Sequence, residues 1–581
     1  MSYPRAFPLV RSLGFWSLVS ALKLLSVSAE GAATDTSNAV DIGSRRELFV
    51  DDALIERLTG KLELRLHEPQ AREVVIVHDA PWEGAGSGYH SVFKDGWLYR
   101  MYYKAWQRTV GPDAPNTGTN PLLCCYAESD DGVHWRKPEL GLFEFNGSKA
   151  NNIVMVSGAV GNLQVDAGHP AVFKDENPAA APDARYKALF RSANPKPRGL
   201  VAFKSPDGIH WVPLADAPVI TDGAFDSQNL AFWDPLRSEY RAYWRYFRQG
   251  ADVADDRNPV GLRSIRTATS KNFIHWENQA DLTFTDSPPA QLYTNQIKPY
   301  ARAPHIFIGF PMRYVDRGWT ESTNALPDLK HREWRATVSP RLGSAVTDSQ
   351  FMASRDGVRF KRWNEAFIRP GIERDGTWSY GQLCVAWQVV ETKNALAGAP
   401  DELSLYADES YWSGARGSAV RRYTLRLDGF VSARATAAGG ELLTKPVRYN
   451  GAKLSLNFST SAAGSVRVEI QDLAGSPLPG FALADSDPLF GDSIDRTVTW
   501  AKRRDVSPLK NQPVRLRFVL NDADVYSYQF QEQPGTRART KPSPSSSHLK
   551  RKPHETIPSL SPATFSVDWV DGVRRIRVGR D

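Results

Sequence analysis

One seven-residue phrase occurs four times along the chain and restricts its fold more than any other feature. The copies occupy residues 129–135 (SDDGVHW), 205–211 (SPDGIHW), 270–276 (SKNFIHW) and 354–360 (SRDGVRF). Their Ser and Asp or Asn side chains can bond to nearby backbone N–H groups, and Gly tolerates the positive φ of a tight turn. Because β-prone runs precede the copies, we interpret each one as a hairpin turn. A hairpin that recurs along a chain is typical of repeat architectures.

The segments between these copies predict the fold class. Each supplies about four short strands, as one blade of a β-propeller does. We count five such units, so the sequence predicts an all-β fold in which a five-bladed β-propeller over residues 34–429 is followed by a β-sandwich. Residues 44–67 are expected to pair with the last blade and thereby close the ring.

The rest of the chain differs from the repeats. Residues 430–530 alternate strands and turns without the phrase, which predicts the β-sandwich. Residues 531–581 are rich in Pro, Ser and basic residues, which predicts a disordered basic tail.

The first 33 residues resemble a secretory signal peptide. Arg5 and Arg11 precede an apolar stretch over residues 12–29, and small residues follow it. An uncleaved membrane anchor is the alternative. No later stretch approaches the roughly 18 apolar residues that a membrane-spanning helix needs. We therefore expect a secreted or periplasmic protein without a membrane span after signal removal.

Charge and cysteine content exclude several classes of protein. The net charge is +7, but residues 531–581 alone hold ten Lys or Arg against five Asp or Glu. The predicted folded body is thus nearly neutral, which argues against a nucleic-acid partner. Cys124, Cys125 and Cys384 are expected to be buried thiols, because three cysteines form no disulfide framework. No Cys or His cluster has zinc-site spacing, so we expect no metal ligands and no cofactor, and the sequence leaves open whether the channel holds Ca²⁺.

Polar and aromatic residues stand where the innermost strands of the predicted blades begin, although a purely structural strand would prefer Val or Ile there. In a propeller these strand starts converge on one axis, where sugar rings can stack on aromatic faces and hydroxyls can pair with carboxylates and amides. A carbohydrate is therefore the predicted partner. The candidate substrate-binding residues are Glu83, His90, His169, Gln228, Asn229, Asn295, Gln296, Trp378 and Tyr380. For each of them a solvated or purely structural role is the alternative.

The phrase, with residues 269–276 (TSKNFIHW) as its clearest instance, resembles the hairpins of five-bladed propeller glycoside hydrolases, the superfamily of invertases and arabinan-degrading enzymes (families 32 and 43). The Asp-box of six-bladed sialidases is a competitor, but it has one more residue between Asp and Gly. Four segments are similar to secreted bacterial proteins described as family-32-like: residues 126–154, 225–244, 291–314 and 421–431. The resemblance implies a propeller followed by a sandwich. The invertase motifs Asn-Asp-Pro-Asn-Gly, Arg-Asp-Pro and Glu-Cys are absent, so fructan hydrolysis is not implied.

We therefore predict a secreted glycoside hydrolase-like protein that cleaves a poly- or oligosaccharide with paired carboxylates in the propeller channel. One carboxyl group must act as acid and the other as nucleophile or base. Among the channel carboxyls we assign the acid to Glu391 and the base or nucleophile to Asp226, with Asp166 shifting their pKa values through its charge. Two alternatives stay open: a non-catalytic carbohydrate-binding propeller, and a glycan phosphorylase that would need a basic phosphate site.

Overall fold

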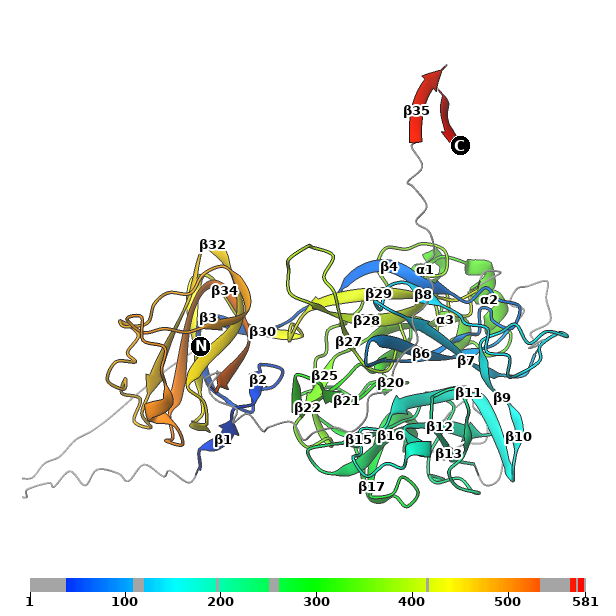
Figure 1. Cartoon of the computed structure of the whole chain (residues 1–581), viewed down its shortest axis with the longest axis horizontal. Helices are drawn as coiled ribbons and strands as arrows, with labels where there is room; N and C mark the ends of the chain where they lie inside the picture. Colours follow the sequence, from blue (N-terminus) through cyan, green and yellow to red (C-terminus); the bar gives the residue numbers. More distant parts are fainter. Residues whose placement is uncertain are drawn as a thin grey trace, which may run out of the picture. The chain divides into compact units, whose positions relative to one another are not determined.

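The computed structural model describes residues 38–107, 120–194, 198–249, 261–413 and 417–532, together with the backbone of two strands near the C-terminus (Figure 1). The predicted signal peptide over residues 1–33 and most of the predicted tail lie outside the described residues. The chain divides into two compact units, Met1–Gln533 and Pro534–Asp581. In the second unit, β35 (Phe565–Val570) pairs antiparallel with β36 (Val573–Val578), within the segment predicted as tail.

The described residues are mostly strands, which confirms the all-β prediction. Between residues 70 and 426 the strands form five main sheets. The first holds β5 (Gly88–Asp95), β6 (Leu98–Ala105), β7 (Leu123–Ser129) and β8 (Trp135–Arg136), with β9 (Ile153–Val156) beside β7. The second holds β10 (Gly158–Val160), β11 (Leu163–Lys174), β12 (Tyr186–Ser192), β13 (Leu200–Ser205) and β14 (Val212–Pro213). The third holds β15 (Leu230–Asp234), β16 (Glu239–Arg248), β17 (Leu262–Ser270) and β18 (Glu277–Asp281).

The last two sheets take strands from distant parts of the chain. The fourth holds β21 (Lys298–Tyr300), β22 (Ala303–Gly309), β25 (Met352–Ser354), β26 (Arg359–Arg362) and β19 (Thr283–Thr285). The fifth holds β27 (Val390–Thr392), β28 (Glu402–Glu409), β29 (Ala419–Arg426) and the early strand β4 (Gln70–Val77).

The strand that completes the fifth sheet is not the predicted one. β4 pairs with β29, whereas the predicted residues 44–67 supply β2 (Arg46–Leu48) and β3 (Ile55–Leu66), which pair with strands after residue 430. The prediction was wrong because both early segments are β-prone, and the choice of a partner several hundred residues away is not encoded in local alternation.

The four repeated phrases are hairpin turns, as predicted. In the first, Ser129 Oγ accepts a hydrogen bond from the Gly132 N–H at 2.9 Å, and Asp131 Oδ1 accepts from the next two N–H groups at 2.8 Å. The same three bonds recur in the other copies. The residue at the Gly position has positive φ in every copy, including Phe273 at +67°.

In three of the four turns, a backbone carbonyl accepts a hydrogen bond from a tyrosine hydroxyl of the neighbouring sheet. Tyr102 of the first sheet donates to the Gly208 carbonyl of the second at 3.0 Å. Tyr243 of the third sheet donates in the same way to the fourth at 2.8 Å, and Tyr406 of the fifth donates to Gly132 of the first at 2.6 Å. The last sheet therefore contacts the first. Where Phe273 replaces Gly, ring packing on Phe173 of the second sheet takes the place of the hydroxyl contact, with ring centroids 5.7 Å apart.

Two buried glutamines join the inner edges of the five sheets. Gln228, just before β15, donates through Nε2 to the carbonyls of His90 and Pro170 at 3.2 and 2.9 Å. Gln296, just before β21, donates to Gln228 Oε1 at 2.7 Å and to the Val385 carbonyl at 2.6 Å. The middle of the axis is thus filled by side chains rather than open.

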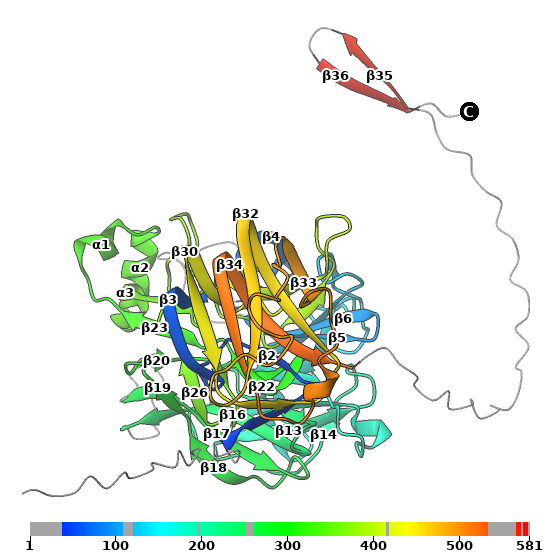
Figure 2. The same cartoon turned by 90° about the vertical axis from the view of Figure 1, so that its left-hand side faces the viewer.

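A bent sheet follows, in which β3, β30 (Val431–Thr444), β34 (Arg515–Gln531), β32 (Lys453–Gln471) and β33 (Asp492–Thr497) lie in that order, with β2 beside β34. Figure 2 shows β30, β34 and β32 side by side. The β32–β34 register shifts between Thr460 and Ser465, and both halves of β32 bury side chains in one core, Leu456 before the shift and Val468 after it. β1 (Val40–Gly43) and β31 (Val447–Tyr449) form a parallel pair.

Three short helices form an insertion in the fourth repeat. They are α1 (Glu321–Ala325), α2 (Leu329–Ala336) and α3 (Arg341–Ser344), and they connect β23 (Met312–Asp316) to β24 (Ala345–Ser349), which form a small sheet with β20 (Gln291–Leu292). Two 3₁₀ turns occupy Pro182–Ala184 and Ser507–Leu509. No helix within the described ranges has the length and apolar character needed to cross a membrane.

Gly208→Ala tests the contact between turn and neighbouring sheet. A Cβ at Gly208 would lie 2.4 Å from Tyr102 Oη, and φ there is +82°. Gly147 has the same kind of backbone, φ +80°, but its Cβ would meet nothing within 4 Å, so Gly147→Ala is the matched control. We expect Gly147→Ala to lower the free energy of unfolding by about 1 kcal/mol through backbone strain. Gly208→Ala should lower it by about 1–3 kcal/mol more, because of the clash. Urea unfolding measures both, and equal losses would contradict the inter-sheet contact.

Asp428 joins the fifth sheet to the bent sheet. Its fully buried carboxylate accepts from Arg302 Nε at 2.7 Å, from Ser527 Oγ at 2.8 Å and from Arg46 Nη1 at 3.2 Å. Burial would raise the pKa of Asp428, but the charges of Arg46 and Arg302 outweigh burial and hold it below its ordinary value.

Asp428→Asn should therefore destabilise the protein by about 3–5 kcal/mol at neutral pH, because it leaves two cations without their buried anion. Since the folded-state pKa is lowered, the stabilisation by Asp428 is present above the unfolded-state pKa and is lost as the pH falls through the folded-state pKa. The variant should thus lose part of the wild-type acid sensitivity in urea unfolding at a series of pH values. Asp492→Asn, which removes an exposed partner of Arg426, should cost less than about 1 kcal/mol.

Candidate functional site

A cluster of charged residues lies near the starts of the inner strands of the second and third sheets. His169 Nδ1 is 3.0 Å from Asp166 Oδ2, and His169 Nε2 is 3.0 Å from Asp226 Oδ1. Arg191 Nη1 lies 3.4 Å from Asp226 Oδ1 and 3.8 Å from Asp166 Oδ2. One imidazole thus bridges two carboxylates, and one guanidinium lies beside both. Three of the predicted site residues, Asp166, His169 and Asp226, are therefore brought together.

Local backbone irregularity places His169 in this cluster. The β11–β12 register shifts between Asp166 and Ala171, so the intervening residues bulge out of the ladder. Asp166 Oδ1 stabilises the bulge by accepting from the Gly168 N–H at 2.8 Å. Asp226 is held on the adjoining loop by Asn229, whose Nδ2 donates to two carbonyls of that loop at 2.8 and 3.0 Å.

Electrostatics keep both carboxyl groups ionised. Burial would raise the pKa of Asp226, but the His169 hydrogen bond and the charges of His169, Arg245 and Arg191 hold it well below its ordinary value. The pKa of Asp166 is lowered against burial in the same way by His169 and Arg191. Burial alone would lower the pKa of His169, yet the two carboxylates raise it. The two carboxylates therefore favour the imidazolium form of His169.

Asp226 is the more exposed of the two carboxylates. Its side chain is 32% exposed, against 12% for Asp166 and 6% for His169. Both His169 and Arg191 contact Oδ1, and no hydrogen bond to Oδ2 is found within the described part of the chain. Asp226 also borders a pocket of about 130 Å³ that Arg191, Asn194 and Arg198 help to line. A ligand in this pocket can reach Asp226.

Tyrosine rings surround the cluster on the side of the axis. The Tyr89 ring lies 5.4 Å from the His169 ring, and Tyr89 Oη donates to Tyr293 Oη at 3.2 Å. The rings of Tyr293 and Tyr380 are 6.2 Å apart at a steep angle. Tyr380, a predicted substrate-binding residue, therefore belongs to the same region as Asp226.

Arginine side chains cover these rings. Arg245 lies 5.0 Å from the centroid of the Tyr293 ring and Arg335 of α2 lies 5.1 Å from that of Tyr380. Arg263 is almost fully buried. Burial lowers the pKa of Arg263, and the positive charges of Arg245 and Arg341 lower it further. The site is thus rich in packed cations, and the helical insertion contributes two of them.

Other predicted site residues are engaged elsewhere in the protein. His90 is buried between Asp408 and His78, at 3.0 and 3.2 Å. Glu83 is also buried and accepts from Tyr103 Oη at 2.6 Å, while Lys137 Nζ lies 2.5 Å away. The His90 contacts connect the first and fifth sheets, and Glu83 ties the loop before β5 to the first sheet.

The predicted amides lie along the inner edges, and Trp378 lies in a loop. Gln228 and Gln296 make the inter-sheet bonds described above, and Asn229 holds the Asp226 loop. Asn295 is buried, with Oδ1 accepting from the Ile297 N–H at 3.4 Å. Trp378 is half-buried, and its indole N–H donates to the Gly371 carbonyl at 2.8 Å.

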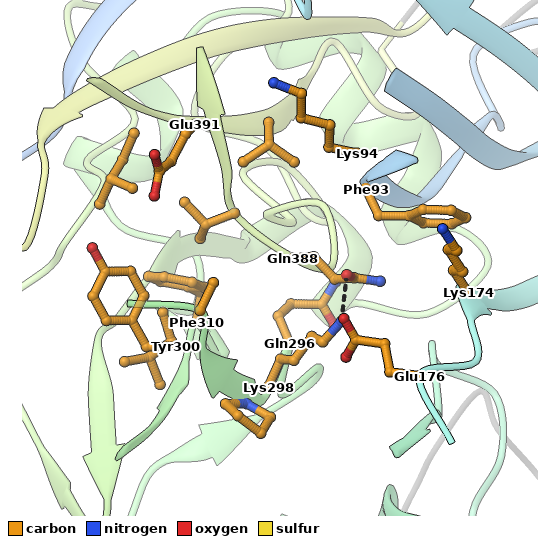
Figure 3. A pocket seen from close by; sticks show the side chains of 16 residues that line it. Phe93, Lys94, Lys174, Glu176, Gln296, Lys298, Tyr300, Phe310, Gln388 and Glu391 are labelled. Carbon is orange, nitrogen blue, oxygen red and sulfur yellow. Dashed lines mark hydrogen bonds between the residues drawn. The ribbon is translucent and has the colours of Figure 1, made fainter. Parts of the chain in front are cut away.

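The structure does not bring Glu391 to the Asp226 cluster. Its side chain is 40% exposed, with Oε1 3.9 Å from Arg302 Nη1. Glu391 lines a different pocket, which it shares with Lys174 at the far end of β11 (Figure 3). Asp166 lies eight residues before Lys174 on that strand, which corresponds to roughly 25 Å of extended chain. The predicted acid and base therefore lie toward opposite ends of the inner strands.

Sequence reasoning missed the cations of the site. Arg245 lies within β16, a strand that is otherwise almost entirely buried, and a charged residue inside such a run was a usable signal. Arg191 ends a similar run in β12. Arg335 and Arg341 lie on the helical insertion, and nothing in their local sequence indicates that they reach the axis.

Cys124, Cys125 and Cys384 are free and buried, as predicted. Over the described ranges, no group of three or more His, Cys, Asp or Glu has an arrangement that could hold a metal ion. Both ring nitrogens of His169 already face carboxylates.

Asp226→Asn should lower the pKa of His169, because it removes one of the two charges that raise it. Nitrogen-15 NMR of the histidine side chains, with His169 assigned by a His169→Gln variant, measures this change. Asp222→Asn is the control, since Asp222 is an exposed carboxylate paired with Arg266 rather than with His169. An unchanged His169 pKa in Asp226→Asn would contradict the bridged arrangement.

No family model and no curated protein matches the chain. Solved structures that it resembles include a fructofuranosidase from Schwanniomyces occidentalis complexed with fructosylnystose, at 13% identity over 79% of this chain and 97% of that chain, with a TM-score of 0.37. An endo-arabinase from Bacteroides thetaiotaomicron matches at 10% identity over 61% of this chain and 98% of that chain, with a TM-score of 0.34.

An N-acetylgalactosamine deacetylase from F. plautii in complex with blood group B trisaccharide matches at 12% identity over 63% of this chain and 95% of that chain, with a TM-score of 0.36. These three solved structures are thus, by their names, of proteins that act on glycans. Because these TM-scores are low, we argue the function from the residues of this chain.

Proposed function

We propose that the chain is a carbohydrate-active protein, a glycoside hydrolase-like enzyme that acts on a poly- or oligosaccharide at the Asp226 cluster. One observation carries this proposal: Asp226 is ionised, partly exposed and held by His169 at the edge of a pocket, beside tyrosine rings. Sugar recognition combines such a carboxylate with aromatic faces.

The fold proposed for this function is a five-bladed β-propeller followed by a β-sandwich, as the sequence predicts. Its support is the contact between the fifth and first sheets, through Tyr406 and Gly132, and the shared core of the bent sheet. The proposed location is secreted or periplasmic.

In a hydrolytic step Asp226 would act as base or nucleophile, because its pKa is held low and Oδ2 is available. His169 would keep Asp226 oriented through Nε2, and Asp166 would hold the opposite ring nitrogen, so that the imidazole stays protonated. The two carboxylates thus have different roles: Asp226 would react, and Asp166 would position His169. Glu391 has no part in this scheme.

A non-catalytic carbohydrate-binding protein is the second candidate. The observation that favours it is the charge state of the cluster, since the pKa values of both carboxyl groups are lowered. The general acid of a glycoside hydrolase is usually a carboxyl group with a raised pKa, and neither carboxyl group of the cluster has one.

A panel of plant and algal polysaccharides and their oligosaccharides tests the proposal by release of reducing ends. Asp226→Asn should reduce kcat by about 10²-fold or more, as expected for loss of a base or nucleophile, while Asp222→Asn should leave it unchanged. Wild-type activity should fall as the pH rises through the pKa of His169. Thermal unfolding of both variants checks that they are folded.

Three outcomes would redirect the proposal. Retained glycan binding without release, in wild type and Asp226→Asn alike, would support the binding protein. Release that requires phosphate would support a glycan phosphorylase. Full activity in Asp226→Asn would remove the cluster from the reaction.

A further inference from the structure

A second pocket of about 320 Å³ lies at the other end of the inner strands, and the proposed function makes no use of it. Figure 3 shows its labelled side chains around one hollow, with Lys94 and Glu391 on one side and Glu176 and Lys298 on the other. They come from four of the five main sheets or from the residues that adjoin them. Its volume is in the range of small-molecule sites.

Two buried amides present unmatched polar atoms in the lining of this pocket. Gln388 Oε1 accepts from Lys298 Nζ at 2.8 Å. An ammonium group can only donate, so the amide orientation is fixed and Gln388 Nε2 is a donor. Within the described part of the chain this Nε2 has no partner, although Gln388 is only 7% exposed. A buried donor without a partner is costly unless a ligand or solvent satisfies it.

Gln296 supplies the complementary atom. Its Nε2 donates to Gln228 Oε1 and to the Val385 carbonyl. A carbonyl can only accept, so this orientation is also fixed, and Gln296 Oε1 is an acceptor without a partner among the described residues. The wall of the pocket therefore holds one buried unmatched donor and one buried unmatched acceptor. A hydroxyl group both donates and accepts, so groups of this kind satisfy both atoms.

The backbone at both glutamines is strained. Gln388 has φ +81° and Gln296 has φ +48°, a region that residues other than Gly seldom occupy. Such strain persists where the surrounding structure requires it and gathers at ligand sites. Here it keeps both amides in the lining of the pocket.

The remaining lining suits an uncharged ring with hydroxyl groups. Three amines, of Lys94, Lys174 and Lys298, and two carboxylates, of Glu176 and Glu391, line the pocket (Figure 3). Lys174 is already paired with Asp95 at 2.7 Å, so charges of both signs are present and nearly balanced. Phe310 and the other apolar side chains of the lining offer faces against which a ring can pack. A site for a small anion would instead have cations in clear excess.

From these observations we propose that the pocket is a second carbohydrate site, one that binds a neutral sugar residue through its hydroxyl groups. The sugar can be a free monosaccharide or the end of a longer glycan, since both present the same hydroxyls. This site is separate from the Asp226 cluster and does not depend on the reaction proposed there.

Isothermal titration of the full chain tests the site. The probes are D-glucose, D-galactose, D-mannose and L-arabinose, the matching disaccharides and, separately, sodium phosphate. Gln388→Glu removes the unmatched donor and keeps an acceptor for Lys298, and it should weaken sugar binding by about tenfold or more. Asp222→Asn, which changes an exposed carboxylate outside both pockets, should leave this binding unchanged. Tighter binding of disaccharides than of monosaccharides would identify a glycan end as the ligand.

Lys94→Met provides a second test that does not touch the strained backbone, and it should also weaken sugar binding. The proposal is overturned if none of these sugars binds, if phosphate alone binds, or if both pocket variants bind as wild type does. Sugar binding that Asp226→Asn abolishes and Gln388→Glu preserves would assign the ligand to the other site. Circular dichroism of each variant shows that it is folded.

Discussion

The five sheets depend on two buried glutamine side chains where their inner edges meet. An inner-edge strand has backbone carbonyls that face the axis, where no further strand can pair with them, and an unpaired buried carbonyl costs about 1–3 kcal/mol. A glutamine amide carries two donors and one acceptor on a long stem. Gln228 and Gln296 use this capacity to reach carbonyls on the first, second and fifth sheets and to bond to each other. Residues of other chemistry, even of similar size, would leave several of these carbonyls unpaired.

The buried side chains at the axis also restrict where a ligand can bind. The axis is filled at its middle by the glutamines and by Trp387, whose buried indole N–H donates to the Ile297 carbonyl at 3.0 Å. A glycan cannot thread from one end of the inner strands to the other. The ligands proposed for the Asp226 cluster and for the Gln388 pocket are therefore separate, and an acid in one place cannot work with a base in the other.

Local features of the fold were predictable from the sequence, and distant pairings were not. The hairpin phrase encodes its own hydrogen bonds through Ser129 and Asp131, so its structure follows from seven residues. β4 and β3 have similar β-prone sequences, and only tertiary packing decides that one joins the fifth sheet and the other joins the bent sheet. Sequence reasoning therefore located the turns and the fold class but assigned residues 44–67 to the wrong sheet.

Prediction of the site residues from the sequence has the same limit. Asp166, His169 and Asp226 were chosen because polar residues at inner-strand starts converge, and the structure brings these three together. The same reasoning also selected Gln228 and Gln296. A polar residue on an inner strand has the same sequence signal whether it binds a ligand or pairs with the backbone. Glu391 was placed with Asp226 because a sequence gives no position along the axis.

The arginines around the cluster determine what Asp226 can do. Arg245 and Arg191 help His169 to hold the pKa of Asp226 low, and the nearby charges of Arg245 and Arg341 lower the pKa of buried Arg263. Asp226 can therefore accept a proton or attack a carbon, but it cannot donate a proton at neutral pH. A hydrolytic reaction needs a proton donor other than Asp226 and Asp166, whereas a binding protein needs none, and the two proposed functions differ in this requirement.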